Sequence, residues 1–159
     1  MNSRTDPTHD THHSNLGSTA VDGLIAGAGA GVVMIAYLLI TAGESPADLL
    51  NRFTGAGMQP SPVTGAVAHL AVSAIYGMVF VIFWRSFRRR PTLLWHVTGG
   101  IVFSLVLFIA AEYVLLPSLQ SPLLAIPALH FGVAHVLYGL ILGYLYYSIG
   151  HIHLKEGQS

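Results

Sequence analysis

Residues 101–116 read IVFSLVLFIAAEYVLL, a run suited to lipid except at Glu112. Glu112 is the only formally charged residue between Arg90 and Lys155. An acid at the centre of a membrane helix costs about 2.5–3.5 kcal/mol on insertion scales, and less near the helix ends. We therefore expect Glu112 to face protein, water or a bound group, which makes it the best pointer to function in the chain.

The whole chain has the composition of a polytopic membrane protein. Of its 159 residues, 53% are hydrophobic and 9% are charged, whereas soluble domains carry about 25% charged residues. Uncharged runs of the length that crosses a bilayer, about 20 residues, lie near 23–43, 63–84, 93–116 and 127–149. These runs do not alternate as barrel strands do. The sequence therefore predicts an all-α fold, a compact bundle of four transmembrane helices.

Charge and cysteine content exclude several classes of function. Seven basic and seven acidic residues give a net charge of zero, so the chain lacks the basic surface typical of nucleic-acid binding. The chain contains no cysteine, which excludes disulfides, thiolate nucleophiles, iron–sulfur ligation and covalent c-type haem.

Polar segments flank and divide the apolar runs. Residues 1–21 are predicted to form a disordered polar tail, residues 22–150 the transmembrane domain, and residues 151–159 a short polar tail. In the first outer loop, Ser45, Pro46 and Asp48 have the pattern of a helix N-cap, N1 and N3. We expect a short interfacial helix there that ends near Gly55.

A cluster of arginines after the second run predicts the orientation. Arginines in short loops stay cytoplasmic, so both termini are expected on that side of the membrane. The same cluster is a candidate site for anionic lipid. Its members are Arg85, Arg88, Arg89 and Arg90.

Small residues recur at intervals of about four along each run and indicate faces where helices pack closely. The first run carries Gly23, Gly27 and Gly31, and the second carries Gly65, Ser73 and Gly77. The third carries Gly100 and Ser104, and the fourth carries Gly139 and Gly143.

The predicted topology places polar residues of three helices at similar depth. His69, Glu112 and His130 are each expected near the outer end of a different span, with His135 deeper in the fourth. Because His130 and His135 are five residues apart, about 140° around a helix, one ligand is not expected to use both. Tyr76 and Tyr138 would extend a polar track toward the centre.

Three interpretations of this cluster remain open. In the first, Glu112 bonds to a histidine and locks the helices together. In the second, the cluster binds haem b or a transition metal through His69, His130 or His135, with Glu112 beside them. In the third, protons or ions move along Tyr76, Glu112 and Tyr138. An enzyme is disfavoured. Intramembrane hydrolysis needs an activated nucleophile or paired carboxylates, and the spans contain a single carboxylate, that of Glu112. We expect a non-enzymatic accessory or packing subunit that contacts lipid and other membrane subunits or a second copy.

The second and fourth runs also share short motifs. Ala68-His69 with Tyr76-Gly77 matches Ala134-His135 with Tyr138-Gly139, which suggests a two-plus-two repeat. With residues 23–27 (GLIAG) and residues 130–132 (HFG), these motifs resemble the YagU-like group of bacterial four-helix membrane proteins over about residues 23–147. The resemblance implies a compact inner-membrane bundle and brings no assigned activity or ligand.

Overall fold

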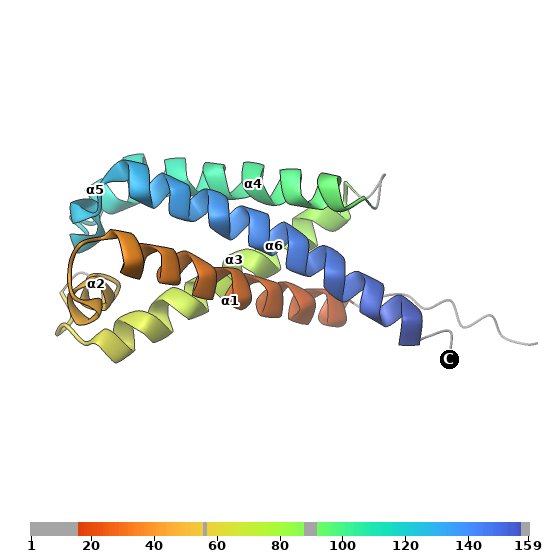
Figure 1. Cartoon of the computed structure of the whole chain (residues 1–159), viewed down its shortest axis with the longest axis horizontal. Coiled ribbons are helices and arrows are strands. Elements are labelled where there is room, and N and C mark those ends of the chain that lie inside the picture. Colours follow the sequence, from red (N-terminus) through yellow and green to blue (C-terminus); the bar gives the residue numbers. More distant parts are fainter. Residues whose placement is uncertain (1–15, 56, 88–91, 157–159) are drawn as a thin grey trace, which may run out of the picture.

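The computed structural model describes residues 16–55, 57–87 and 92–156, with side chains placed as far as residue 150. Four long helices form a bundle (Figure 1): α1 (Leu16–Thr41), α3 (Pro62–Arg85), α4 (Leu93–Ala110, continued to Ser118) and α6 (Ala128–Glu156). By length and apolar composition each is suited to cross a membrane. The predicted all-α fold of four apolar helices is therefore confirmed, and the chain has the character of an integral membrane protein.

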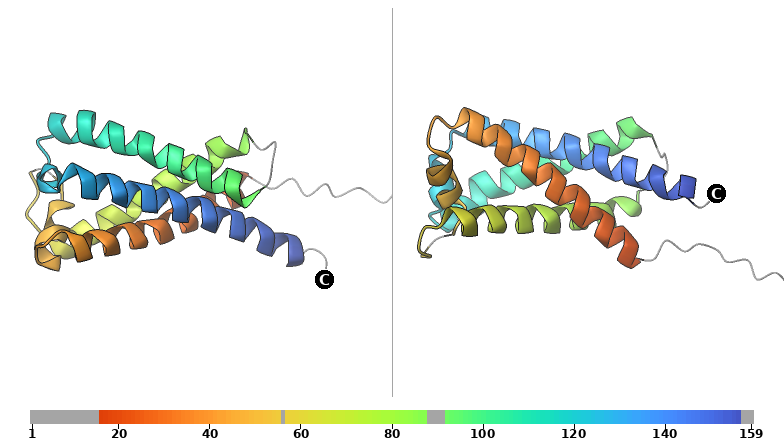
Figure 2. Two further views of the ribbon diagram at one scale, coloured as in Figure 1. Left: turned by 45° about the horizontal axis from the view of Figure 1, so that its top comes forward. Right: turned by 60° about the horizontal axis from the view of Figure 1, so that its bottom comes forward.

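The helices are arranged in the order α3, α1, α6, α4. Helix α1 packs against both α3 and α6, and α4 packs against α6, whereas α3 and α4 make few contacts (Figures 1 and 2). The two helices in the middle of this order, α1 and α6, are the most buried. In their most apolar stretches, 39% of the residues are buried in α1 and in α6, against 28% in α3 and 22% in α4. Helices α3 and α4 therefore leave the most surface for lipid or other partners.

Glycines allow α1 and α3 to approach at backbone distance. A Cβ atom added to Gly77 would overlap the carbonyl oxygen of Gly23 and the Cα of Gly27. Beside this contact, Gly31 of α1 faces the side chain of Ser73 on α3. Without hydrophobic attraction between helices in lipid, this close packing is a main source of their association.

Helices α4 and α6 approach each other in the same way, but here the serine lies on the earlier helix and the glycine that faces it lies on the later helix. A Cβ atom on Gly139 would overlap the carbonyl oxygen of Gly100 and the hydroxyl of Ser104. One turn along α6, Gly143 lies against the carbonyl of His96. The small residues of consecutive spans therefore meet in two close pairs, α1 with α3 and α4 with α6.

The predicted short helix between the first and second spans is confirmed as α2 (Pro46–Arg52). Its N-cap Ser45 accepts a hydrogen bond from the backbone N–H of Asp48, and Pro46 opens the helix. Phe53 caps its other end. Gly65 of α3 lies directly against the carbonyl oxygen of Leu50, so α2 packs on the start of α3. We call this end of the bundle, with its connecting loops, the α2 end.

The third span continues to Ser118, beyond the predicted run that ends near residue 116. After Ala110 the chain forms a π-helix, η1 (Ala111–Leu115), and then one further helical turn, α5 (Leu116–Ser118). The N–H of Leu116 bonds to the carbonyl of Ala111, five residues back. This wider turn directly precedes Pro117, whose ring would clash with the carbonyl four residues before it in a regular α-helix. A 3₁₀ turn, η2 (Pro122–Ala125), then leads to α6.

Two helices extend into the predicted polar tails. Helix α1 begins at Leu16 and α6 ends at Glu156, so residues 16–21 and 151–156 are helical. Helical hydrogen bonding does not require apolar side chains, and no proline interrupts either segment. The start of α1 and the end of α6 lie at the same end of the bundle, opposite α2 (Figure 1). Arg88, Arg89 and Arg90 lie outside the described residues, and the cytoplasmic orientation stays a prediction.

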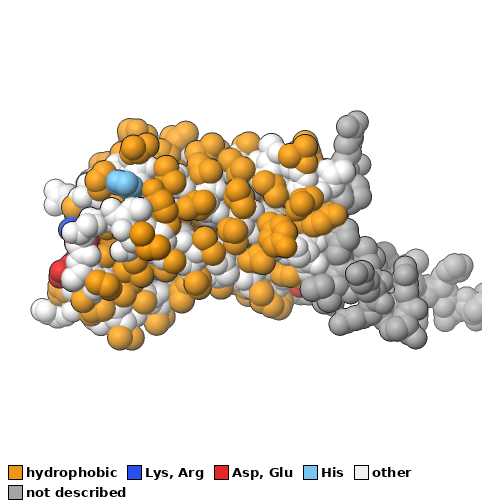
Figure 3. Space-filling model, in the orientation of Figure 1, with side chains coloured by type: hydrophobic (Ala, Val, Ile, Leu, Met, Phe, Trp, Pro, Cys, Tyr) orange, Lys and Arg blue, Asp and Glu red, His pale blue; other side chains and the backbone are white. Residues whose placement is uncertain are grey.

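The surface between the two ends is apolar. Figure 3 shows one long face on which hydrophobic side chains cover most of the area, and charged side chains appear only toward the ends. Lipid tails are a suitable environment for such a belt.

Candidate functional site

His69 is held in the core between α3 and α1. Its Nε2 lies 3.0 Å from the carbonyl oxygen of Gly31. Because a carbonyl only accepts, this ring nitrogen donates the hydrogen bond. The ring of Phe53, at the end of α2, meets the imidazole edge to face at 4.9 Å between centroids. His69 is therefore buried, oriented by a backbone carbonyl and covered from the α2 end.

His135 is held in a similar way on α6. Its Nδ1 donates to the carbonyl of Phe131 on its own helix, over 2.8 Å. The rings of Phe131 and Phe108 pack against it, with centroids 4.5 and 5.6 Å away. His135 is buried like His69, with 8% and 7% of their surfaces exposed.

A hydrogen bond between α6 and α3 places the two histidines at a similar level along the bundle. The hydroxyl of Tyr138 donates to the carbonyl of Ser73 over 2.7 Å. His69 precedes Ser73 by four residues and His135 precedes Tyr138 by three, so each lies one turn away. Both helices run from the α2 end (Figure 1), so both histidines lie one turn from this bond on its α2 side. The two imidazoles also interact electrostatically.

His130 lies apart from this pair. Its Nδ1 is 3.2 Å from the hydroxyl of Tyr37 on α1, and the side chain is partly exposed. Tyr76, by contrast, packs against the core and interacts electrostatically with Tyr138. Tyr138 therefore lies one turn from His135, Tyr76 lies two turns from His69, and His130 is tied to α1.

Glu112 stands alone on the π-helical segment. Its Oε2 is enclosed by the protein yet has no hydrogen-bond partner within the described residues. Its Oε1 is not enclosed, and no hydrogen bond or ion pair joins Glu112 to a histidine in this part of the chain. The expected lock between Glu112 and a histidine is therefore not formed there.

The structure thus separates the residues that the sequence places at one depth. His69 bonds to Gly31, His135 to Phe131 and His130 to Tyr37, and Glu112 bonds to none of the histidines within the described residues. Among residues 16–55, 57–87 and 92–150, no group of three or more histidine, aspartate or glutamate side chains is placed to hold a metal ion. The sequence indicates how deep a residue lies along its span, but the packing of the helices decides in which direction its side chain points.

A polar clamp at the α2 end was not foreseen from the sequence. Arg52 bonds to both carboxylate oxygens of Glu44, with its Nη2 2.8 Å from Oε2 and its Nε 2.9 Å from Oε1. Its Nη1 donates to the carbonyl of Pro122 over 3.2 Å, which joins the α1–α3 connection to the α4–α6 connection at the α2 end. The hydrogen bond to Glu44 raises the pKa of Arg52. The sequence contained a signal for this clamp, because Arg52 is the only arginine or lysine between Arg4 and Arg85.

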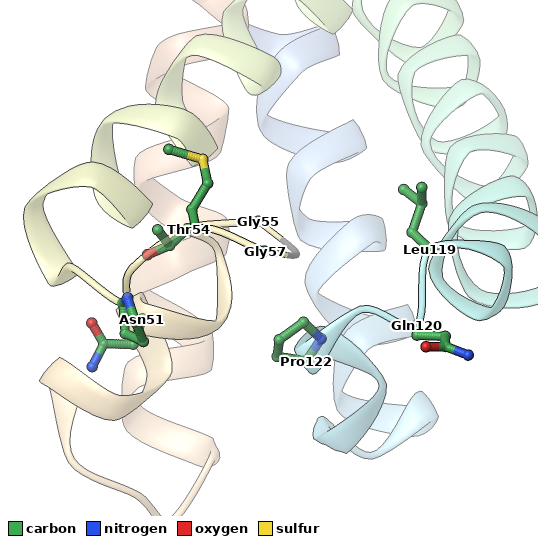
Figure 4. A pocket seen from close by; sticks show the side chains of 9 residues that line it. Asn51, Thr54, Gly55, Gly57, Leu119, Gln120 and Pro122 are labelled. Atoms are coloured by element: carbon green, nitrogen blue, oxygen red, sulfur yellow. The ribbon is translucent and has the colours of Figure 1, made fainter.

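A cavity of about 360 Å³ lies beside this clamp, between these two connections (Figure 4). Thr54 lines one side, but its hydroxyl is already bonded to the backbone of Ser61. In Figure 4 the amides of Asn51 and Gln120 point away from each other. The polar side chains of this cavity therefore do not converge on one ligand.

No known family model, curated protein or solved structure matches the chain.

Proposed function

We propose that this integral membrane protein is a non-enzymatic accessory subunit that binds another membrane protein along the outer part of α4 and η1. The observation that carries the proposal is the carboxyl group of Glu112. It lies on a span suited to the membrane, and none of its hydrogen-bonding capacity is met within the described residues.

Lipid tails leave this carboxyl group without a partner. Acyl chains carry no hydrogen-bond donor, and polar groups within membranes are costly unless they find one. Because Oε2 is enclosed and Oε1 is not, Oε1 is the oxygen that a neighbouring molecule can reach. A donor on a transmembrane helix of a partner, such as an arginine, lysine or hydroxyl side chain, supplies the missing interaction.

The surroundings of Glu112 suit a helix in contact. Helix α4 packs against α6 on one side and has few contacts with α3 on the other. Exposed apolar side chains surround Glu112 along this surface, which we call the α4 face: Val102, Leu105, Val106, Ile109, Tyr113 and Val114. Van der Waals packing on the α4 face and one polar contact at Glu112 together are typical of helix association in membranes.

Photo-crosslinking in native membranes tests this proposal. A photoreactive amino acid at Tyr113 or Ile109 on the α4 face is expected to give a discrete crosslink to another membrane protein. Glu112→Leu should reduce the yield several-fold, because it removes the polar contact. The matched control is the same probe at Val72, which is exposed on α3 and should crosslink mainly to lipid.

The products also distinguish the kinds of partner. A product of twice the mass of the chain identifies a second copy, which is self-association through the same face. Crosslinks from Tyr113 and Ile109 to lipid alone, with or without Glu112, contradict the proposal.

Haem or metal binding and a proton path remain alternatives. The structure supports the set His69, His130 and Glu112 less well, since the two histidines bond to different parts of the protein and Glu112 bonds to neither within the described residues. The purified chain is expected to be colourless. A Soret band that disappears in His69→Ala or His130→Ala would favour haem, and proton flux in liposomes that stops in Glu112→Gln would favour the path.

A further inference from the structure

Glu112 is followed in the chain by a hydrogen-bond donor that also lacks a partner. Tyr113 is the most exposed side chain of the α4 face, with 67% of its surface accessible. Its ring packs against that of Phe108, with centroids 6.3 Å apart, and within the described residues its hydroxyl makes no hydrogen bond. A phenol hydroxyl donates and a carboxyl oxygen accepts. The α4 face therefore carries an unmet acceptor and an unmet donor on consecutive residues of η1.

The exposed side chains that lead to Tyr113 have the spacing of a seam between two helices. They recur at intervals of four, three and four residues: Val102, Val106, Ile109 and Tyr113. Left-handed pairs of membrane helices bring positions of this spacing together, as coiled coils do. Tyr113 lies on the π turn and is nevertheless exposed as Ile109 is. In heptad terms Tyr113 takes an a position, and Glu112 takes the g position beside the seam.

A second copy of the chain presents the same residues at the same depth. Two copies inserted in one direction are related by a two-fold axis along the membrane normal. In such an interface, if residue i contacts residue j of the other copy, then j also contacts i. Consecutive residues of a helix differ in depth by only about 1.5 Å. Glu112 of one protomer can therefore lie opposite Tyr113 of its partner, and the symmetry forms this contact twice.

We infer that the partner on the α4 face is a second copy of this chain. The two copies form a parallel two-fold dimer in which the Tyr113 hydroxyl of each protomer donates to the Glu112 carboxyl group of the other. This inference rests on the proposed role of the α4 face and names its occupant. A foreign helix with one donor satisfies Glu112 alone, whereas a second copy satisfies Glu112 and Tyr113 with residues that the face already carries.

Energy transfer between fluorescently labelled chains in phosphatidylcholine liposomes tests the dimer. The chain has no cysteine, so one thiol added at a terminus carries the label. Transfer between wild-type chains should fall as the chains are diluted with lipid. Glu112→Leu and Tyr113→Phe each delete both bonds of the dimer and should weaken it about eight-fold, for two bonds of the average strength measured between membrane helices.

Two further variants serve as matched controls. Tyr144→Phe deletes a hydroxyl at an exposed position on α6 and should leave the dissociation constant unchanged. Glu112→Gln keeps an oxygen that accepts a hydrogen bond and should dimerise more tightly than Glu112→Leu.

A mixture of the two disruptive variants gives a result that a reciprocal contact predicts. The Glu112→Leu chain still has Tyr113, and the Tyr113→Phe chain still has Glu112. Their mixed dimer regains one of the two bonds, so it should be about three-fold tighter than the dimer of either variant alone. Misfolded chains would not recover on mixing, so this measurement also separates loss of the contact from loss of folding.

Single thiols locate the seam. Ile109→Cys should form a disulfide between protomers under mild oxidation, because seam positions approach to the separation of about 4.4–6.8 Å between Cα atoms that a disulfide spans. Val79→Cys, exposed on α3, should stay largely unlinked.

The inference is overturned if transfer between wild-type chains does not depend on dilution, or if neither disruptive variant weakens the dimer. It is equally overturned if the mixed dimer is no tighter than the dimers of the variants alone, or if Val79→Cys links as readily as Ile109→Cys. Photo-crosslinks from Ile109 to a different membrane protein would overturn the second copy as occupant and leave the proposed function standing. Crosslinks to lipid alone would overturn both.

Discussion

The hydroxyl of Tyr138 on α6 donates a 2.7 Å hydrogen bond to the backbone carbonyl of Ser73 on α3. Tyr138 belongs to the close pair α4–α6, and Ser73 belongs to the close pair α1–α3. The bond therefore joins the two pairs through the centre of the bundle, where Tyr138 is buried and no water competes.

Removal of this hydroxyl should loosen the two pairs. Tyr138→Phe keeps the ring and deletes the donor. We expect a loss between about 0.6 kcal/mol, the average measured for side-chain hydrogen bonds between membrane helices, and about 1.7 kcal/mol, the largest value. Unfolding in a detergent titration measures the change. Tyr144→Phe, at an exposed position, is the matched control and should leave stability unchanged; equal losses in both would contradict the assignment.

Gly77 should tolerate no side chain. Gly77→Ala places a methyl group against the backbone of Gly23 and Gly27, which has no flexible atoms to move aside. We expect a loss of about 1–3 kcal/mol, typical of overpacking, in the same titration. Gly150→Ala meets no atom within 4 Å and should be neutral or slightly stabilising, because alanine favours helix more than glycine does.

The clamp at the α2 end should depend on the shape of the guanidinium group. Arg52→Lys keeps the charge but cannot bond both oxygens of Glu44 and the carbonyl of Pro122 together. We expect faster proteolysis of the α1–α3 and α4–α6 connections and a stability loss of about 1 kcal/mol or less, as for a partly exposed pair. Glu44→Gln should act in the same direction, and 1 M salt should shrink both effects.

The pH response of the clamp follows from the direction of the pKa shift. The bond to Glu44 raises the pKa of Arg52 above its unfolded value. The stabilisation is therefore fully present below the unfolded pKa and is lost only as pH rises through the still higher folded value. Proteolysis rates of the wild-type connections should stay flat from neutral pH to pH of about 10, since arginine stays protonated there.

Pro117 should maintain the π turn that carries Glu112. Pro117→Ala restores an N–H and removes the ring clash, so we expect η1 to revert to α-helix. A π-helical turn contains one residue more than an α-helical turn. Its reversion to α-helix should rotate the following side chains by about 100° relative to α4. Since the chain has no cysteine, single thiols at Tyr113, Val114 and Leu115 can be labelled one by one. The most reactive position should shift by one residue in Pro117→Ala; an unchanged pattern would show that the π turn does not depend on proline.

Orientation is tested by tags. The arginine cluster after α3 predicts that both termini are cytoplasmic. A tag at either terminus should resist external protease in whole cells and be cleaved after permeabilisation. Cleavage in intact cells would reverse the predicted orientation.

The fold was accessible from the sequence because its signals are local. Four apolar runs gave the spans, and Ser45 with Pro46 gave the start of α2. The stripes of small residues indicated packing faces, but a stripe does not reveal which helix it meets. That Gly77 meets Gly23 and Gly27, rather than a glycine of α6, is a property of the assembled bundle.

The candidate site was less accessible for a geometric reason. Counting residues from the span ends placed His69, Glu112 and His130 at one depth, but depth does not give direction around the helix. His130 turns toward Tyr37, and the π turn changes the phase at Glu112. The bond from Tyr138 to Ser73, which joins α6 to α3, is likewise a property of the assembled bundle. The resemblance to the YagU-like group stays a prediction.

The two closest helix interfaces, α1 with α3 and α4 with α6, each lie between consecutive spans. Each is therefore a helical hairpin that can close as soon as its second helix has entered the bilayer. The first hairpin can assemble while the ribosome is still making the second. The contacts between the hairpins, among them those of α1 with α6 and the bond from Tyr138 to Ser73, must wait for the complete chain. The gene could accordingly be divided between the codons for α3 and α4, and the two halves made separately would be expected to meet again in the membrane.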